Sequence, residues 1–591
     1  MRIVRDTWKI LDKRSKLTIL LLQFFLIGSS LLETLSIVVL APFMGLLSGE
    51  FTIQNNQYIN YIFERSNVSY DEFIFYFGIF VLVFFIISNL INIFSLYFIS
   101  FFSERIGAKI SSRLYNVYIQ KPYDFHIEKT SSEIMSKISY DADRFYTLIK
   151  RILVANADVL KCIFIISALI IYNVKVAIFL TLIFVLIYLV IFLFLEKILV
   201  KNSRILSENN AFILKLILEG LGAIKDIIIL KRYIFFSKSF LRYKLSGSKI
   251  NAFNQTSAMI PKNVIEMVAF SMLISLILIN LKGNIVMSNS LSLLAVFGLA
   301  SYKLLPAFQN IYFSISIIKS SQESFYKIRD DLKEKTTTII NRDSSIKLPF
   351  NKILELKNIN WNYKQSEKKV LDNINIKIKP NEIVGIVGKS GSGKTTLGNI
   401  ILGLLEPQKG KFIVDGIEID KSNLDKWQNN ISFVPQNIFL LVGSLRENIT
   451  FGEEPHLFSQ EKFDKAIKMA DLQEYVNKSK YGIDTLVGER GIALSGGQSQ
   501  RVGIARAFYT NRDILFFDEA TSSLDGLTES NVINSVRKLK NKTLFLISHN
   551  FNTIKNCDKI IFLEDGKVED IGNYWELVKK NKKFASLAEV S

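Results

Sequence analysis

The distribution of hydrophobic positions divides the chain into two parts. Long apolar runs occur only before position 320, whereas residues 351–591 alternate short apolar segments with polar ones. A helix needs about 20 mostly apolar residues to cross a bilayer. Six runs reach that length, at residues 17–46, 73–102, 150–172, 175–197, 260–281 and 289–316. The pattern predicts an α-helical membrane domain with six transmembrane helices, followed by a globular domain.

Basic residues concentrate beside the apolar runs, as in "RIGAKISSRLYNVYIQK". With the N-terminus inside, the loops at 103–149 and 198–259 face the cytoplasm, in agreement with the positive-inside rule. The net charge of +19 could also indicate nucleic-acid binding, but the six spans argue against a nucleic-acid partner. The N-terminus lacks a small-residue cleavage site, so we expect the first span to be retained rather than removed as a signal peptide.

The inner loops keep a helical periodicity, which predicts that the membrane helices continue into the cytoplasm. Pro122 breaks this pattern, and Thr130 with Ser131 and Glu133 forms a candidate cap where the helix restarts. The outer loop at 47–72 carries apolar residues among polar ones. It fits either an amphipathic helix at the membrane surface or an ordinary loop.

The polar segment that follows the last span is interpreted as a connector. We expect a transmembrane domain over 1–325, a connector over 326–350 and a nucleotide-binding domain over 351–591. In the last part, strand-like and helix-like segments alternate, which is typical of an α/β fold. Cysteine occurs only at Cys162 and Cys557, so neither a disulfide framework nor a zinc cluster is expected.

The segment "GKSGSGKT" has the pattern of a phosphate-binding loop. It follows the apolar strand "EIVGIV" and precedes the helical run "TTLGNIILGLL", which is the context such a loop requires. Glycines let backbone N–H groups surround phosphates, a lysine can reach the outer phosphates and a threonine can bind Mg²⁺. The candidate ATP-binding residues are Gly388, Ser390, Gly391, Gly393, Lys394, Thr395 and Thr396.

Three further apolar strands end in residues suited to ATP hydrolysis. Asp518 closes "ILFFD" and is placed to organise Mg²⁺, and Glu519 is free to polarise the attacking water. His549 follows the strand in "LFLISHN" and is a candidate sensor of the γ-phosphate. Gln436, after "ISFV", could reach the metal or the water. Alone, each of these residues could be merely structural.

Taken together, the motifs "GKSGSGKT", "VPQN", "LSGGQ", "ILFFDEATSSLD" and "ISH" resemble the nucleotide-binding domain of ATP-binding cassette (ABC) transporters in order and spacing. The resemblance implies that ATP and Mg²⁺ are bound, with Thr395, Gln436 and Asp518 as the metal site. It implies further that Tyr363 stacks on adenine and that Asp525 contacts a second cassette. Six spans preceding one cassette resemble the exporter half-transporters of this family.

In that family, "LSGGQ" covers the γ-phosphate held by a second cassette. Ser495, Gly496, Gly497 and Gln498 would therefore act in trans, most simply in a homodimer. By the same resemblance, Glu489 in "VGERG" contacts the inner-loop helices. Tyr123 and His126 lie at the break in the first inner loop and are the coupling candidates there.

Ionisable residues within spans are costly and often functional. The substrate candidates are Glu33 in the first span, Lys262 in the fifth and Lys303 in the sixth. Lys262 could instead form an i,i+4 pair with Glu266. Lys303 has no acidic neighbour one turn away, and the proline that follows suggests a kink lining a cavity.

The segments "ETLSIVVLAPF", "SSEIMSKIS", "IPKNVIE" and "SYKLLPAFQNIY" resemble bacterial flippases of lipid-linked oligosaccharides. The resemblance implies an ATPase of the bacterial inner membrane that moves a lipid-linked glycan among membrane lipids, with both termini and the cassette cytoplasmic. A drug, lipid or peptide exporter is the alternative. An ATP-gated channel or sensor is less favoured, because Glu519 equips the chain for hydrolysis.

Overall fold

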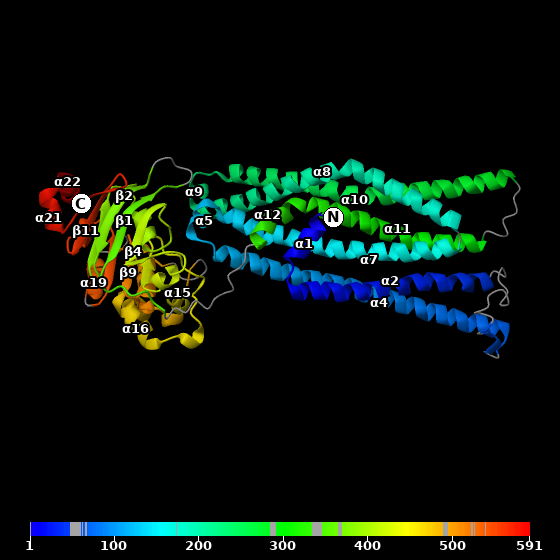
Figure 1. The fold of residues 1–591 in the computed structure, drawn as a ribbon, viewed down its shortest axis with the longest axis horizontal. Coiled ribbons are helices and arrows are strands. Elements are labelled where there is room, and N and C mark those ends of the chain that lie inside the picture. The colour runs from blue at the N-terminus through cyan, green and yellow to red at the C-terminus, as the bar shows by residue number, and fades with distance from the viewer. Residues whose placement is uncertain are drawn as a thin grey trace. The chain divides into compact units, whose positions relative to one another are not determined.

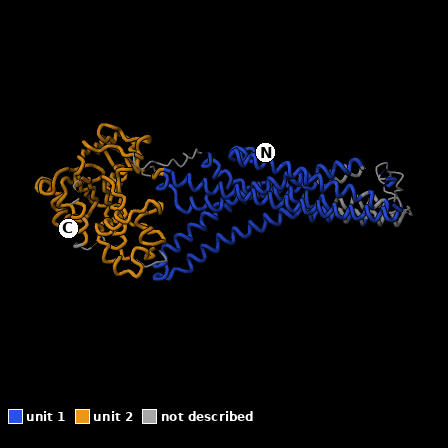
Figure 2. Tube along the Cα trace, turned by 90° about the horizontal axis from the view of Figure 1, so that it is seen from below, with its two compact units in different colours: residues 1–121, 125–337 blue, residues 122–124, 338–591 orange. Residues whose placement is uncertain are grey.

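The computed structural model describes residues 2–47, 61, 63–65, 68–172, 174–283, 291–333, 346–363, 369–488, 494–521, 524, 526–537, 539 and 541–590. The chain forms two compact units, which Figure 2 shows in different colours. The helical unit comprises residues 1–121 and 125–337, and the α/β unit comprises residues 122–124 and 338–591.

Long helices build the helical unit (Figure 1). Those of 30 residues or more in the described part are α2 (Lys13–Leu47), α4 (Tyr70–Ile119), α7 (Ala142–Tyr172), α8 (Val174–Gly222), α10 (Tyr233–Gly283) and α11 (Leu291–Ser320). Each overlaps one predicted span, and α4, α8 and α10 extend well beyond it. Among the described residues, three segments are long and apolar enough to cross a membrane, at Lys13–Leu40, Tyr70–Ile119 and Ser131–Ile171. The number of six crossings stays a prediction.

The core of the helical unit forms where α2, α4 and α7 pack together. Ile19, Ile106 and Leu148 are buried there. The buried residues of each helix recur at helical spacing and therefore lie on one face. On other faces of α4, large apolar side chains such as Phe80 and Phe94 are exposed. An apolar outer surface of this kind suits a helix that contacts lipid, because lipid tails impose no penalty on exposed apolar groups.

Short helices connect or extend the long ones. They are α1 (Arg2–Ile10), α5 (Tyr123–Glu128), α6 (Ser131–Ser136), the π-helical turn η2 (Lys137–Asp141), α9 (Ile224–Ile229) and α12 (Gln322–Lys333). The restart after Pro122 is confirmed, because the Thr130 side chain accepts from the backbone N–H of Glu133 and caps α6. The outer loop predicted at 47–72 lies largely outside the described residues.

Helix α12 occupies the beginning of the predicted connector. Its residues Phe325, Ile328 and Leu332 are buried in the core formed by α2, α4 and α7. The predicted domain boundary at 325 therefore falls inside a helix, and the helical unit continues to 337. This segment is polar in overall composition, so its three buried apolar residues, which recur at three- and four-residue spacing, did not indicate a helix.

Two larger sheets occur in the described part of the α/β unit. An antiparallel sheet has the order β2-β1-β4-β5, with β1 (Leu354–Trp361), β2 (Leu371–Ile378), β4 (Lys409–Val414) and β5 (Ile417–Glu418). The second sheet has the order β12-β11-β3-β10-β9-β6. Its strands are β3 (Ile383–Gly388), β6 (Ile431–Val434), β9 (Ile514–Asp518), β10 (Thr543–Ile547), β11 (Lys559–Glu564) and β12 (Lys567–Gly572). All neighbours in it are parallel except β11 and β12.

Helices and short elements complete this unit. Two short strands, β7 (Gly443–Ser444) and β8 (Leu486–Val487), pair with each other. The helices are α13 (Lys394–Ile401), α14 (Leu424–Gln428), α15 (Leu445–Thr450), η3 (Pro455–Leu457), α16 (Gln460–Met469), α17 (Gln473–Lys478), η4 (Gly482–Asp484), α18 (Gly496–Thr510), α19 (Gly526–Arg537), α20 (Phe551–Ile554), α21 (Tyr574–Lys580) and α22 (Lys582–Val590). The parallel strands are buried on both faces, which explains their continuous apolar sequences.

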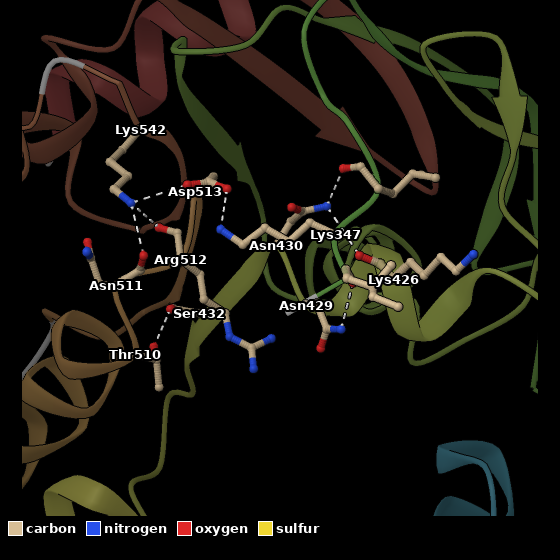
Figure 3. A network of polar contacts seen from close by, with 12 residues as sticks. Lys347, Lys426, Asn429, Asn430, Ser432, Thr510, Asn511, Arg512, Asp513 and Lys542 are labelled. Carbon is tan, nitrogen blue, oxygen red and sulfur yellow. Dashed lines mark hydrogen bonds and ion pairs between the residues drawn. The ribbon is translucent and has the colours of Figure 1, made fainter. Parts of the chain in front are cut away.

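The segment that enters the α/β unit is tied to it by polar contacts (Figure 3). The buried Asn430 donates its side-chain amide to the carbonyl of Leu348 at 2.7 Å. Lys347 Nζ lies 2.6 Å from Asp513 Oδ2, and Lys542 Nζ lies 3.5 Å from the other oxygen of that carboxylate. Because Asp513 directly precedes β9 and Lys542 directly precedes β10, these contacts join the incoming chain to the starts of two strands of the parallel sheet.

Candidate functional site

The phosphate-binding loop connects β3 with α13. Two of its glycines adopt backbone angles that disfavour other residues, with φ of 79° at Gly391 and 99° at Gly393. A Cβ atom on Gly388 would lie 2.2 Å from the carbonyl oxygen of Leu563. These positions explain why the turn is rich in glycine: the loop passes close to its neighbours and turns into the first residues of a helix.

Lys394 is folded into this loop rather than extended into solvent. Its Nζ donates to the carbonyls of Gly388 and Lys389, at 2.8 and 3.0 Å, and the residue is 6% exposed. Burial lowers the pKa of the Lys394 ammonium, while the charges of Glu519 and Asp518 oppose that shift. A buried cation held only by carbonyls and nearby carboxylates is placed to bind an anion such as a phosphate.

Glu519 lies directly after β9 and is held from two sides. Gln436 Nε2 donates to Glu519 Oε2 at 2.6 Å, and His549 Nε2 lies 2.7 Å from Glu519 Oε1. The backbone of Glu519 has a left-handed φ of 48°, and its N–H donates to the carbonyl of Ile547 in β10. The parallel order of β6, β9 and β10 brings these side chains to one edge of the sheet.

Asp518, the last residue of β9, has a strongly perturbed carboxyl group. Burial and the neighbouring charge of Glu519 raise its pKa to about 6, and the charge of Lys394 opposes them. A pair of carboxylates with a nearby ammonium is a recognised signature of a functional site. The structure thus brings together Lys394, Asp518, Glu519, Gln436 and His549, as the sequence predicts.

The remaining loop residues differ in burial. Ser390 and Thr395 are exposed, and Thr396 is buried. Ser392 was not among the predicted site residues; it is 4% exposed and its hydroxyl has no hydrogen-bond partner in the described structure. An unpartnered buried hydroxyl beside Lys394 fits a loop that completes its hydrogen bonds with a ligand. The pattern "SGSGKT" contained it, but its burial depends on the tertiary structure.

The other predicted ATP contacts lie outside the phosphate-binding loop. Tyr363 is 37% exposed and packs edge-to-face on Trp361, with ring centroids 4.4 Å apart. Ser495 caps α18: its hydroxyl accepts from the N–H of Gln498, and the Gln498 side chain accepts from the N–H of Ser495. Gly496 and Gly497 form the first turn of this helix. Asp525 lies outside the described residues.

The coupling candidates are placed only in part. Tyr123 and His126 are exposed on α5, a helix without buried residues. Phe125, between them, stacks on Tyr118 of α4 with ring centroids 6.0 Å apart. Glu489 lies outside the described residues. A short helix therefore follows Pro122, with both candidate side chains at its surface.

Among the substrate candidates, Lys303 has no acidic neighbour one turn away in its own helix, but it has an acidic partner on another helix. Lys303 Nζ lies 3.1 Å from Glu33 Oε1, although 270 positions separate the two residues. Lys161 Nζ lies 2.9 Å from the other oxygen of Glu33 and 3.7 Å from Asp158. Lys161 and Asp158 were missed, although two ionisable residues three positions apart within the predicted span at 150–172 could have revealed them.

Lys262 behaves as the alternative interpretation expected. Its Nζ lies 3.7 Å from Glu266 one turn away, and both side chains are more than 40% exposed. It lies outside the set of residues that line the cavity beside Glu33. Pro306 does line this cavity, together with Lys303. The geometry thus favours Lys303 and Glu33 over Lys262 as parts of an internal site.

Two family models match the chain. The model for the ABC transporter domain matches residues 371–522, and the model for the ABC transporter transmembrane region matches residues 19–309. A solved structure of a bacterial Atm1-family ABC exporter with ATP bound superposes with a TM-score of 0.76 and 17% identity, over 95% of this chain and 98% of that chain. The prediction of a helical transmembrane domain followed by an α/β nucleotide-binding domain is confirmed.

Curated relatives are similar over shorter lengths. The "ATP-dependent lipid A-core flippase" of Pectobacterium atrosepticum is 36% identical over 235 residues, which is 40% of each chain. The "Leukotoxin translocation ATP-binding protein LktB" of a Pasteurella haemolytica-like species is 38% identical over 229 residues, 39% of this chain and 32% of the relative. The alignments thus span less than half of each relative. From the two family matches and the fold, this chain is a multi-pass membrane protein that belongs to the ABC transporter family and has the architecture of an exporter half-transporter.

Proposed function

We propose that the chain couples ATP hydrolysis to export across a membrane. The observation that carries this proposal is Glu519, whose two carboxylate oxygens are held by Gln436 and His549 beside Asp518. A carboxylate fixed in this way can accept a proton from an attacking water. Lys394 would neutralise phosphate charge, and His549 would contact the γ-phosphate. Residues 351–591 would act as the ATPase domain and residues 1–325 as the translocation domain.

The donor set also fits Mg²⁺. Thr395 provides a hydroxyl, Gln436 an amide oxygen and Asp518 a carboxylate, which are the oxygen ligands that this ion prefers. When bound, the ion would neutralise charge on the phosphates. The raised pKa of Asp518 supports this assignment, because a buried carboxylate near Glu519 gains from a nearby cation. Tyr363 would stack on the adenine.

A second copy of the chain would complete each ATP site. Ser495 and the glycines after it lie at the N-terminus of α18, a 15-residue helix. The N–H groups at a helix N-terminus attract anions. We propose that this end of α18 meets the γ-phosphate bound by the partner, with Asp525 contributing to the same interface. ATP would then stabilise a closed homodimer, and hydrolysis would release it.

For the cargo, we propose a lipid-linked oligosaccharide that is flipped across a bacterial inner membrane, with the nucleotide-binding domain in the cytoplasm. The relatives named lipid A-core flippases support a lipid substrate. The partly buried Lys161 and Lys303 support a charged head group, because a purely apolar cargo would not require them. Glu489, Tyr123 and His126 are proposed to couple the cassette to the membrane helices.

The test reconstitutes the purified chain in sealed vesicles with a fluorescent lipid-linked saccharide. ATP-dependent loss of the saccharide from one leaflet, together with phosphate release, would support the proposal. The Glu519→Gln chain is the matched control, since it should assemble without turning over ATP. Hydrolysis without movement of any saccharide would refute the proposed cargo.

An exporter of a toxin, peptide or drug is the second candidate. It is favoured by the relatives named for leukotoxin and hemolysin translocation. The same vesicles loaded with unfolded polypeptides or amphipathic dyes separate the two candidates by which cargo stimulates phosphate release. Slow ATP turnover that no cargo stimulates would instead indicate a channel or sensor.

A further inference from the structure

Four ionisable side chains form one cluster inside the helical unit. Glu33 lies on α2, Asp158 and Lys161 on α7, and Lys303 on α11. Their side chains are only 5–17% exposed. Glu33, Lys161 and Lys303 each lie near the middle of a predicted span, where a charge is most costly in a bilayer. The packing of α2, α7 and α11 therefore places these charges at a similar depth within the predicted spans.

Glu33 bridges the two lysines. One of its oxygens lies 2.9 Å from Lys161 Nζ and the other lies 3.1 Å from Lys303 Nζ. Lys303 is also 5.5 Å from the centre of the Phe85 ring, which favours a cation but provides no counter-charge. Two ammonium groups that hold the two oxygens of one anion are arranged as they would be to hold two oxygens of a phosphate.

The cluster borders a cavity of about 290 Å³ among α2, α4, α7 and α11. Polar side chains from several helices line the cavity beside Glu33 and Lys303, among them Ser29, Ser30, Asn92, Ser95 and Asn310. Asn310 also hydrogen-bonds Asp158. A salt bridge that only joined helices would need no polar cavity beside it. Hydroxyl and amide groups facing a space within a membrane bundle are placed to bind a polar ligand.

Charge balance limits what this cavity can accept. Two ammonium groups and two carboxylates cancel, so an added anion meets no net positive charge while Glu33 stays in place. An added anion can contact the two lysine ammonium groups only if the Glu33 carboxylate moves away from them. An anion therefore binds only if it interacts with the lysines more favourably than the Glu33 carboxylate does. A strongly charged phosphate can meet this requirement, and a weakly interacting anion cannot.

We propose that Glu33 is a built-in counter-anion that occupies a phosphate-binding position between Lys161 and Lys303, and that the diphosphate of the cargo displaces it. This inference rests on the proposed function for the identity of the cargo, but the site itself is defined by the charge cluster. Glu33 is a specificity residue here: it lowers the affinity for the anion and leaves the lysines neutralised when the cavity is empty.

The test measures diphosphate binding to the full-length chain in lipid nanodiscs by calorimetry. Because the phosphate-binding loop would also bind diphosphate, every chain carries Lys394→Ala. The probes are inorganic pyrophosphate and a polyprenyl diphosphate. Glu33→Gln retains the shape of the side chain and removes its charge. We expect it to bind diphosphate about tenfold more tightly, and we expect added Lys161→Gln to reverse that gain.

The matched control is Glu266→Gln, which makes the same change in an exposed pair away from the cavity and should leave affinity unchanged. Should Glu33→Gln fail to assemble, Glu33→Asp retains the charge but shortens its reach, and should tighten binding to a lesser degree. Unchanged or weaker binding in the variant that assembles would overturn the proposal and make the cluster a structural tie between helices.

The two probes separate the possible sources of the anion. Tighter binding of both supports recognition of the diphosphate itself, and tighter binding of the polyprenyl form alone supports a lipid-linked head group. A gain with pyrophosphate alone supports the anion site but assigns it to a free phosphate compound. If the unmutated chain moves no lipid-linked saccharide while Glu33→Gln binds diphosphate more tightly, the proposed cargo is wrong and the site stands. If the unmutated chain moves the lipid-linked saccharide but Glu33→Gln does not bind diphosphate more tightly, the proposed cargo stands and the role proposed for Glu33 is wrong.

Discussion

His549 Nε2 and Glu519 Oε1 lie 2.7 Å apart at the carboxyl edge of the parallel sheet. The contact joins the ends of β9 and β10, which pair in parallel from Thr543 with Ile514 to Ile547 with Asp518. Together with Gln436, which donates to the other oxygen, this contact fixes the orientation of the Glu519 carboxylate. A preoriented base is ready for proton transfer without a further search of rotamers.

Replacing Glu519 by Gln should separate binding from hydrolysis. The amide preserves the size of the side chain, while the proton acceptor is lost. We expect phosphate release to fall about 10²- to 10⁴-fold, with ATP binding retained and a closed dimer accumulating. Phosphate release, nucleotide binding and size-exclusion chromatography measure these effects. The control Glu406→Gln changes a surface side chain that is 70% exposed, and near-normal hydrolysis by Glu519→Gln would remove Glu519 from the mechanism.

Mixed dimers test whether α18 acts on the partner. With Ser495→Arg on one chain and Lys394→Ala on the other, both lesions fall in one composite site if sites are shared in trans, and the second site stays intact. With both lesions on one chain, each site carries one lesion. We expect one ATP site to close in the first arrangement and neither site to close in the second. Cross-linking across the dimer in the presence of ATP measures this closure. The reverse pattern would show that each chain uses its own α18.

The ionisation of Asp518 should make the nucleotide-free protein sensitive to pH. Its pKa is raised from 3.8 to about 6, so the native state holds the proton more tightly than the unfolded state. This contribution to stability is present at acidic pH and is lost as the pH rises through about 6. Asp518→Asn should therefore raise the free energy of unfolding by about 1–3 kcal/mol at pH 8, and by less at pH 5.

Thermal unfolding without nucleotide and Mg²⁺ measures this effect. Saturating Mg²⁺ and ATP should reverse the order of stability, because an ionised carboxylate at position 518 binds Mg²⁺ more strongly than the neutral amide of asparagine does. An equal gain from Asp518→Asn at both pH values would show that the carboxyl group is not titrating in this range.

Asn430 should hold the incoming chain to the α/β unit. Asn430→Ala leaves the carbonyl of Leu348 without its buried donor, which should cost about 1–3 kcal/mol. The expected results are a lower melting temperature and faster proteolysis between the two units. Asn429→Ala is the matched control, since Asn429 donates to the carbonyl of Ile346 through a solvent-exposed hydrogen bond. Equal effects of the two substitutions would contradict a special role for Asn430.

Sequence reasoning succeeded where the governing interactions are local. The helix restart at Thr130 depends on a cap that spans three residues, and the phosphate loop depends on glycines within eight positions. Apolar runs likewise indicated the long helices, because helical periodicity and bilayer thickness act on contiguous residues. The same reasoning placed the start of the connector too early, because the apolar stripe of α12 is short and interrupted by charges.

The sequence by itself determined the chemical types at the ATP site: a lysine and threonine in a glycine-rich loop, and carboxylate, amide and imidazole groups at strand ends. Tertiary structure decided their partners. Gln436 meets Glu519 only because β6 and β9 are neighbours in the sheet, and Lys303 meets Glu33 because α2 and α11 pack with those faces inward. Pairing across elements depends on strand order and on helix rotation, which are set by burial of the whole core and not by any contiguous stretch of residues.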